Sequence, residues 1–332
     1  MDNTIYPTVV FVLGSLGVLA NSITFLMITF FKPRNYDYTV KLIKWARLPE
    51  LMIALISGPF LRVRIMYPIY GAACSKNTFL FLQNELAICI VILIALASAI
   101  YIIDFIMLAY LSRYNTFCRK KKVNYFNKFE AAGFIFWAII VVIVAFGFVN
   151  NLWLRKELYY TVQPNVFPII EPFHNSDFTI VVLNTNFSNT IMMVLLAQVL
   201  FKVIIIPFCV VVYYIPLELA LKQCMNDARS QTADRIKRNL KYLRICVILP
   251  IILALAPIGL PFLLTFIPHI PDDVYIWIRD FAIIGPQLYC IISPIIQLYY
   301  VHKQTFMRRK TNKVKAIIVS QQLPTPNSPN HK

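Results

Sequence analysis

Seven long apolar stretches alternate with shorter polar segments along the 332 residues of the chain. Each stretch holds about the 20 residues that an α-helix needs to cross the hydrocarbon core of a membrane. The pattern predicts an all-α membrane protein, built as a seven-transmembrane helix bundle. The expected helices are 8–31, 48–70, 79–111, 129–152, 190–216, 245–267 and 277–300.

Lysine and arginine residues gather in every second gap between these stretches. One set of gaps holds 5, 6, 7 and 7 of them, at 32–47, 112–128, 217–244 and 301–332. The other set holds 1, 2 and 0, at 71–78, 153–189 and 268–276. Because cytoplasmic loops collect basic residues, we expect the N-terminus outside, an odd number of crossings and the C-terminus inside.

We expect one membrane domain over 1–302 and a cytoplasmic segment over 303–332, basic at first and disordered at its end. The polar gap 217–244 is compatible with helix, so helices five and six should extend into the cytoplasm. The outer gap 153–189 is interpreted either as a short hairpin or as a lid over the bundle. The basic residues of 303–315 either hold a short eighth helix against anionic lipid or simply stop translocation.

Composition changes this picture little. Hydrophobic residues make up 59% of the chain and charged residues 14%, as a membrane protein requires. The net charge of +17 is explained by the loops, so no nucleic-acid partner is expected. The chain has no HExxH, GxSxG, phosphate-binding glycine loop or CxxC motif, and its four histidines lack metal-ligand spacing. We therefore expect neither an enzyme nor a bound metal or other cofactor.

Two features of the outer segments bear on processing. Asn186 begins an N-x-S glycosylation acceptor in a gap that the charge rule places outside. Cys74 is the only cysteine expected outside, and the gap 153–189 offers it no partner. We therefore expect a glycosylated outer loop and no disulfide framework.

Charged side chains inside membrane spans are costly and usually face the interior of a bundle. A ligand-binding cavity that opens outward is therefore expected to be lined by Glu85, Lys202, Asp280 and Gln287. In the alternative, Glu85 and Lys202 pair with each other, while Arg62 and Arg64 extend to the membrane surface.

On the inner side, Ser112-Arg113-Tyr114 ends helix three. Seven-helix receptors of the rhodopsin type carry an acid-Arg-Tyr triplet here, and Ser112 replaces the acid. An ion pair between adjacent residues is therefore not available to Arg113. In the alternative interpretation, Arg113 is one more charge that obeys the positive-inside rule. The candidate contacts for a G protein are Arg113, Tyr114, Arg235, Lys237 and Arg238.

Short segments spread over most of the chain carry a family resemblance. They are Lys41–Trp45, Gly58–Leu61, Tyr67–Gly71, Arg113–Asn115, Pro257–Pro261, Ser293–Gln297 and Val301–Arg308. Their order and spacing resemble the nematode serpentine chemoreceptors of the Str superfamily, most closely serpentine receptor class H, with classes I and D as alternatives. The chain departs from that family at Leu111, where the family has Glu, and at Gln304–Phe306, where it has Pro-Tyr.

The resemblance implies a G-protein-coupled receptor for environmental chemicals in the plasma membrane of sensory neurons, usually at cilia. Its partners would be a heterotrimeric G protein, the lipid bilayer and a small-molecule ligand of unknown identity. The alternatives are a neuropeptide-type receptor of the same architecture, a transporter or ligand-gated channel, and a non-signalling member. The chain shows no internal repeat or continuous polar pore, as the transporter or channel would require.

Overall fold

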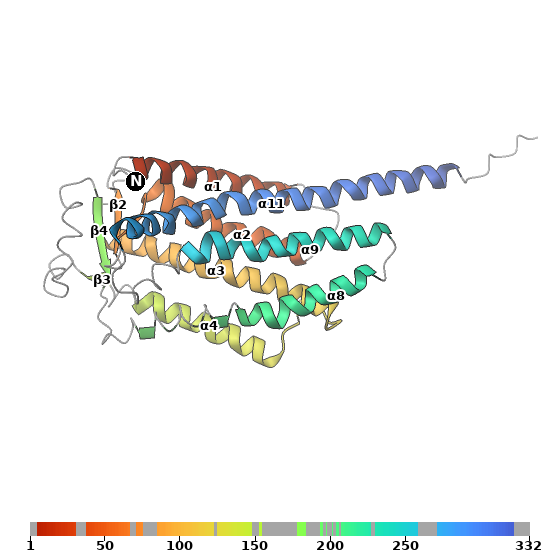
Figure 1. The fold of residues 1–332 in the computed structure, drawn as a ribbon, viewed down its shortest axis with the longest axis horizontal. Coiled ribbons are helices and arrows are strands. Elements are labelled where there is room, and N and C mark those ends of the chain that lie inside the picture. The colour runs from red at the N-terminus through yellow and green to blue at the C-terminus, as the bar shows by residue number, and fades with distance from the viewer. Residues whose placement is uncertain are drawn as a thin grey trace, which may run out of the picture.

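The fold is dominated by long helices that lie side by side along one axis (Figure 1). The computed structural model describes residues 5–30, 38–66, 71–75, 85–122, 125–147, 153–154, 178–183, 207–226, 230–257 and 271–321, and a few single positions within 193–205. The α-helices are α1 (Ile5–Phe30), α2 (Tyr38–Leu55), α3 (Glu85–Phe117), α4 (Lys128–Gly147), α8 (Ile215–Asn226), α9 (Ser230–Pro250) and α11 (Asp272–Gln321).

Several helices have the length and composition of membrane spans. In the described part of the chain these are Ile5–Phe30, Leu86–Phe117, Pro207–Asn226 and Trp277–Tyr300. Large apolar side chains such as Leu19, Phe208 and Ile295 are exposed on the outside of the bundle. Such a surface is stable in lipid rather than in water. The prediction of a helical membrane protein is thus confirmed, while the number of crossings and their orientation stay predictions.

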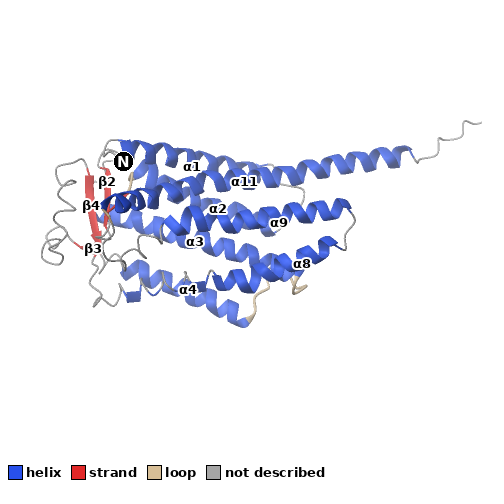
Figure 2. Cartoon of the chain, in the orientation of Figure 1, coloured by secondary structure: helices blue, strands red, loops and turns tan. Residues whose placement is uncertain are grey.

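A small antiparallel sheet covers one end of the bundle. Its strands are β1 (Arg64–Met66), β2 (Gly71–Ser75), β3 (Trp153–Leu154) and β4 (Phe178–Leu183), in the order β1-β2-β4-β3. Gly71 pairs with Val182 and Ser75 with Phe178, so β2 is paired along its whole length. The sheet lies at the end that holds the N-terminus, which we call the sheet end (Figure 2). Within the gap 153–189, β3 and β4 pair antiparallel, and the choice between a hairpin and a lid stays a prediction because residues 155–177 lie outside the described part.

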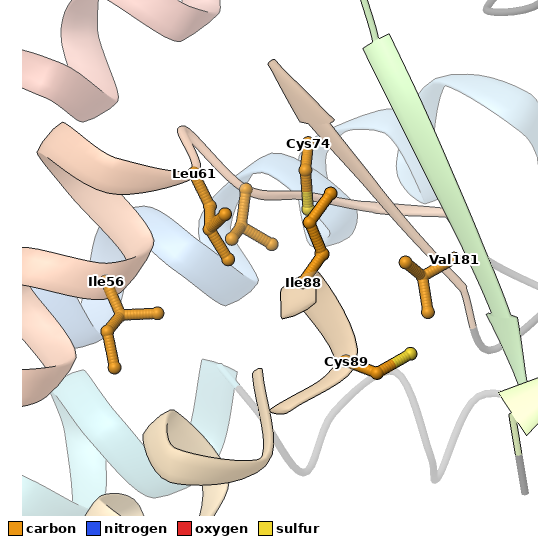
Figure 3. Close-up of a cluster of buried hydrophobic side chains, with 7 residues drawn as sticks. Ile56, Leu61, Cys74, Ile88, Cys89 and Val181 are labelled. Atoms are coloured by element: carbon orange, nitrogen blue, oxygen red, sulfur yellow. The ribbon is translucent and has the colours of Figure 1, made fainter. Parts of the chain in front are cut away.

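Side chains from the sheet pack into the bundle beneath it. Cys74 of β2 and Val181 of β4 are buried in one cluster with Leu61, Ile88 and Cys89 (Figure 3). Both cysteines are free thiols. The cluster fixes the sheet to the first turns of α3, so the sheet belongs to the core rather than to a detached loop.

The second helix does not have its predicted bounds. It runs through α2 and a π-helical segment, η1 (Ile56–Phe60), rather than over 48–70. The prediction is wrong because it counts Lys41 and Lys44 as loop residues, although long basic side chains can reach the membrane surface from within a helix. At the other end Arg62 adopts a left-handed conformation, with a φ of 44°, and turns the chain into β1.

Three described helices are interrupted by π-helical turns next to prolines. Pro59 lies within η1, Pro216 follows η6 (Val210–Tyr214) and Pro257 follows η7 (Ile251–Leu255). Proline removes an amide donor and crowds the carbonyl one turn before it, so a wider turn relieves the clash. Helices two, five and six of the prediction therefore each contain a local break.

The other end of the bundle, which we call the basic end, carries exposed lysines. They are Lys120, Lys121, Lys122, Lys222, Lys237 and Lys241. α8 continues to Asn226 and α9 begins at Ser230, so the predicted extension of helices five and six beyond their apolar stretches is confirmed as helix. α11 runs unbroken to Gln321, so 303–315 continues helix seven instead of forming a separate eighth helix (Figure 1).

Two glycines bring α1 and η1 into backbone contact. A Cβ atom added to Gly14 would lie 2.5 Å from the Cα of Gly58 and 2.8 Å from the carbonyl oxygen of Ala54. Both are backbone atoms, which cannot move aside as the end of a flexible side chain can. The crossing of these helices thus depends on hydrogen as the side chain of Gly14.

The substitution Gly14→Ala should lower the free energy of unfolding by about 1–3 kcal/mol, because the crowded methyl group forces the backbones apart. Gly133 of α4 is the matched control, since an added Cβ there meets nothing within 4 Å. Gly133→Ala should leave stability unchanged or raise it by up to about 1 kcal/mol through helix propensity. The thermal unfolding midpoint of the detergent-solubilised protein measures both, and equal midpoints for the two variants would contradict the contact.

Candidate functional site

An ion pair is buried halfway along α2. Arg47 and Glu50 are three residues apart and therefore lie on one face of the helix. The two guanidinium nitrogens lie 2.6 and 2.7 Å from the two carboxylate oxygens. Each side chain is only 1% exposed. This two-pronged geometry is the strongest form of an arginine–carboxylate contact.

The pair also joins three helices. The Ser293 hydroxyl of α11 donates to Glu50 over 3.2 Å, and Arg47 donates to the Asn21 side-chain oxygen of α1 over 3.3 Å. The Asn21 amide nitrogen in turn donates to the carbonyl of Cys290 over 2.8 Å. Each polar group of this network has a partner inside the protein, so α1, α2 and α11 form one fixed unit.

Neither Arg47 nor Glu50 is among the sequence-based candidates. Glu50 lies within the expected helix 48–70, so the rule that selected Glu85 and Lys202, an ionisable group inside a span, applies to it equally. Arg47 stands at the last position of a basic gap. It was therefore counted as a loop charge rather than as the partner of Glu50.

The sequence candidate Arg113 lies in an aromatic stack near the basic end. Its guanidinium carbon is 5.7 Å from the ring centre of Tyr242 of α9. The Tyr242 ring stacks on Tyr300 of α11, with centroids 3.8 Å apart and an interplanar angle of 8°. We call these three residues the Arg113 stack. It connects the end of α3 to α9 and α11.

The charge of Arg113 is only partly compensated. The side chain is half-buried, and no acidic side chain among the described residues forms an ion pair with it. A cation–π contact contributes about 0.5–2 kcal/mol. Removing a guanidinium from water costs several kcal/mol. The stack alone therefore does not offset the burial of this charge.

A cavity of about 70 Å³ separates the buried ion pair from the Arg113 stack. Side chains of α2, α3, α9 and α11 line it, and the polar ones include Arg47, Glu50, Arg113, Tyr242, Ser293 and Gln297. A single buried water needs about 10–15 Å³, so the cavity has room for a group of several non-hydrogen atoms. The Oε1 atom of Gln297 is buried without a hydrogen-bond partner.

Tyr114 belongs to a second cluster, which folds the α3–α4 connection against helix five. The Arg119 guanidinium lies 5.0 Å from the Tyr114 ring and pairs with Glu130 of α4 at 2.8 Å. The hydrogen bond from Arg119 to this carboxylate raises the pKa of the guanidinium. Tyr213 donates to Glu130 over 2.8 Å. The backbone amide of Asn127 donates to the Glu130 carboxylate and the backbone amide of Glu130 donates to the Asn127 side-chain oxygen, which together form a capping box.

A more exposed ion pair connects helices five and six. Glu218 of α8 accepts from Arg244 of α9 at 2.6 Å, from Tyr214 at 2.6 Å and from Lys222 at 2.9 Å. About half of the Arg244 side chain is exposed, so solvent screens the pair. This ion pair is therefore weaker than the Arg47–Glu50 pair, and buried leucines of α8 and α9 add to the contact between the two helices.

The described candidates at the sheet end have partners within the protein. Asp280 lies 3.3 Å from the Nε atoms of both Arg64 and Arg279. Arg64 is buried, so the interpretation that it extends to the membrane surface is wrong. The amide nitrogen of Gln287 donates to the Ser57 hydroxyl, and the Oε1 atom of Gln287 is buried without a partner. Asp280 thereby ties β1 to α11, while a ligand role for either candidate stays a prediction.

Other candidates lie outside the described residues. They are the side chains of Glu85, Arg235 and Arg238, and the residues Lys202 and Asn186. Glu85 is the first residue of α3, and Lys237 is exposed on α9. In the described part of the chain, no group of three or more His, Cys, Asp or Glu side chains is placed to hold a metal ion.

Helices with exposed apolar surfaces, packed around an apolar core that contains buried ion pairs, define the class as a helical membrane protein. No family model matches the chain, and no curated protein is significantly similar to it.

Replacing Arg47 by Met should lower the free energy of unfolding by about 3–5 kcal/mol, because Glu50 is left charged and unpaired in the bundle. The double variant Arg47→Met, Glu50→Leu should recover most of that loss, since no buried charge remains. Thermal unfolding of the two variants beside the parent protein measures the difference. A double variant no more stable than Arg47→Met would show that the pair is not the reason for the loss.

Proposed function

We propose that this chain is a G-protein-coupled chemosensory receptor that detects a small environmental chemical and signals through a heterotrimeric G protein. The Arg113 stack is the observation that carries the proposal. It holds Arg113 of α3 against α9 and α11 at the basic end, beside a cavity, while Tyr114 packs against Tyr213 of helix five. A cytoplasmic partner that inserts there would meet Arg113 once α9 moves away.

Signalling requires a ligand that binds one arrangement of the helices more tightly than the other. In the proposed receptor the ligand binds towards the sheet end, near the predicted residues Glu85, Lys202, Asp280 and Gln287. α8 and α9 then shift at the basic end, and Arg113 leaves Tyr242. The G protein contacts Arg113 and Tyr114 together with the basic residues of α9.

The energetics of the described contacts support a movement of α8 and α9 rather than of the whole bundle. Buried hydrogen bonds from Asn21 and Ser293 to the Arg47–Glu50 pair of α2 join α1, α2 and α11, whereas Arg113 contacts α9 through an aromatic ring at the basic end. A cluster of buried leucines and the Glu218–Arg244 ion pair hold α8 and α9 to each other, so the two helices would move together. The π-helical turns η6 and η7 lie in the chain segments that would move. Such turns and their prolines are places where a helix can bend.

The cellular setting follows from the family resemblance. We propose a multi-pass protein of the plasma membrane of sensory neurons, at the cilia, in serpentine receptor class H. The amino end would face the exterior and the basic end the cytoplasm, in agreement with the lysines exposed there.

The test expresses the full chain with an N-terminal tag and a C-terminal tag in cells that carry energy-transfer sensors for several G proteins. A panel of volatile and water-soluble chemicals is applied. At least one chemical should activate a G protein, and Arg113→Ala should abolish that response, because the G protein loses its central contact on α3. Surface staining of the N-terminal tag without permeabilisation normalises the response to receptor number.

Lys128→Gln is the control, because it removes an exposed charge at the basic end without touching the Arg113 stack. It should keep the response. An undiminished response of Arg113→Ala at equal surface staining would remove Arg113 from the mechanism. Staining of the C-terminal tag on intact cells would refute the orientation. A chemical-evoked current that persists without any G protein would favour the ligand-gated channel.

A further inference from the structure

The cavity beside the Arg113 stack has an excess of positive charge. Among the described side chains that line it, Arg47, Glu50 and Arg113 carry full charges, two positive and one negative. Glu50 accepts both hydrogen bonds of the two-pronged contact with Arg47 and one more from Ser293. The negative charge of Glu50 is therefore balanced by Arg47. Among the described lining residues, Arg113 is then the cation without a counter-charge.

The remaining polar liners do not supply a counter-charge. Tyr110, Tyr242 and Tyr289 are phenols, and Cys246 is a thiol, all neutral near pH 7. The contact with Tyr242 recovers only part of the cost of removing a guanidinium from water. An anion beside Arg113 would remove this imbalance.

The shape and donors of the cavity restrict the class of anion. Guanidinium groups present planar, forked donors that match the oxygens of carboxylates and phosphates. Arg113 supplies such a fork, and Tyr242 and Gln297 also line the space. The amide nitrogen of Gln297 donates to the Ser293 hydroxyl over 3.3 Å and has a second hydrogen that could reach an anion. The volume of about 70 Å³ suits one compact oxyanion rather than a large ligand.

We propose that the cavity between α2, α3, α9 and α11 is a binding site for a phosphate group, held by the guanidinium of Arg113. The phosphate comes either from free inorganic phosphate or from the headgroup of a phospholipid in the leaflet at the basic end. Because the bound anion faces α9 from α3, it holds these helices together. The inference does not rest on the receptor function, since it concerns binding to the protein in any signalling context.

The experiment uses the full chain in detergent, in potassium phosphate or in potassium chloride of equal ionic strength and pH. Phosphate should raise the thermal unfolding midpoint in a saturable way, by about 2–4 °C when it exceeds its dissociation constant several times. Arg113→Gln should lose this rise. Lys237→Gln, which removes an exposed charge at the same end, should keep it.

Equilibrium dialysis with radiolabelled phosphate gives a second readout on the unmodified protein, with one phosphate per chain expected. The variant Arg113→Lys keeps the charge but loses the fork, so it should bind phosphate severalfold more weakly. This variant keeps the test decisive if Arg113→Gln fails to fold.

A lipid arm separates the two sources. The protein is placed in nanodiscs of phosphatidylcholine alone or with added phosphatidylinositol 4-phosphate. If the thermal unfolding midpoint rises with that lipid but not with free phosphate, and Arg113→Gln loses this rise, the site is assigned to a lipid headgroup. No rise with either probe, or the same rise in parent and Arg113→Gln, overturns the proposal and leaves a general ionic effect only.

Discussion

A charge inside the bundle needs a partner, because the surrounding lipid offers no water to solvate it. The ion pairs Arg47–Glu50 and Arg64–Asp280 meet this constraint at two levels along the helices. α11 takes part at both levels, through Ser293 beside Glu50 and through Asp280 itself. The position of α11 is therefore set by charge pairing as much as by apolar packing. The helices that pack against α11 are positioned by it in turn.

The same constraint divides the bundle into a firmer and a looser part. α1, α2 and α11 share buried hydrogen bonds around the Arg47–Glu50 pair, and their loss would leave buried polar groups without a partner. α9 contacts α3 through the ring of Tyr242 and through the Leu243 carbonyl, which accepts from Tyr110. Arg244 and a cluster of buried leucines hold α9 to α8, and both contacts stay closed when the two helices move together. An anion beside Arg113 would strengthen the looser part and leave the firmer part unchanged.

Hydropathy predicted the helices well because burial in lipid is a local property of the sequence. Partners were not predictable in the same way. Asp280 pairs with Arg64, which lies 216 residues away in the sequence. Hydropathy marks Asp280 as a charge inside a span, but it does not identify this partner or show that Asp280 ties a strand to α11. The predicted bounds of helix two are wrong because basic side chains can lie within a membrane helix. Glu50 is not among the predicted site residues, although it is an ionisable group inside a predicted span. The side chain of Glu85 and the residue Lys202 lie outside the described part of the chain, so a pair between these two residues stays a prediction.

The sheet limits how a molecule could approach the interior from the N-terminal end. β1 is fixed to α11 by Arg64–Asp280, and β2 and β4 are fixed to α3 through Cys74 and Val181. Entry through the middle of the sheet would break backbone pairing and this cluster together, which costs more than passage at its edge. From Asp280 to Ser293 α11 spans about 20 Å at 1.5 Å per residue. Pro286 lies between these two contacts, so a shift at the sheet end either bends α11 there or reaches the network around Arg47.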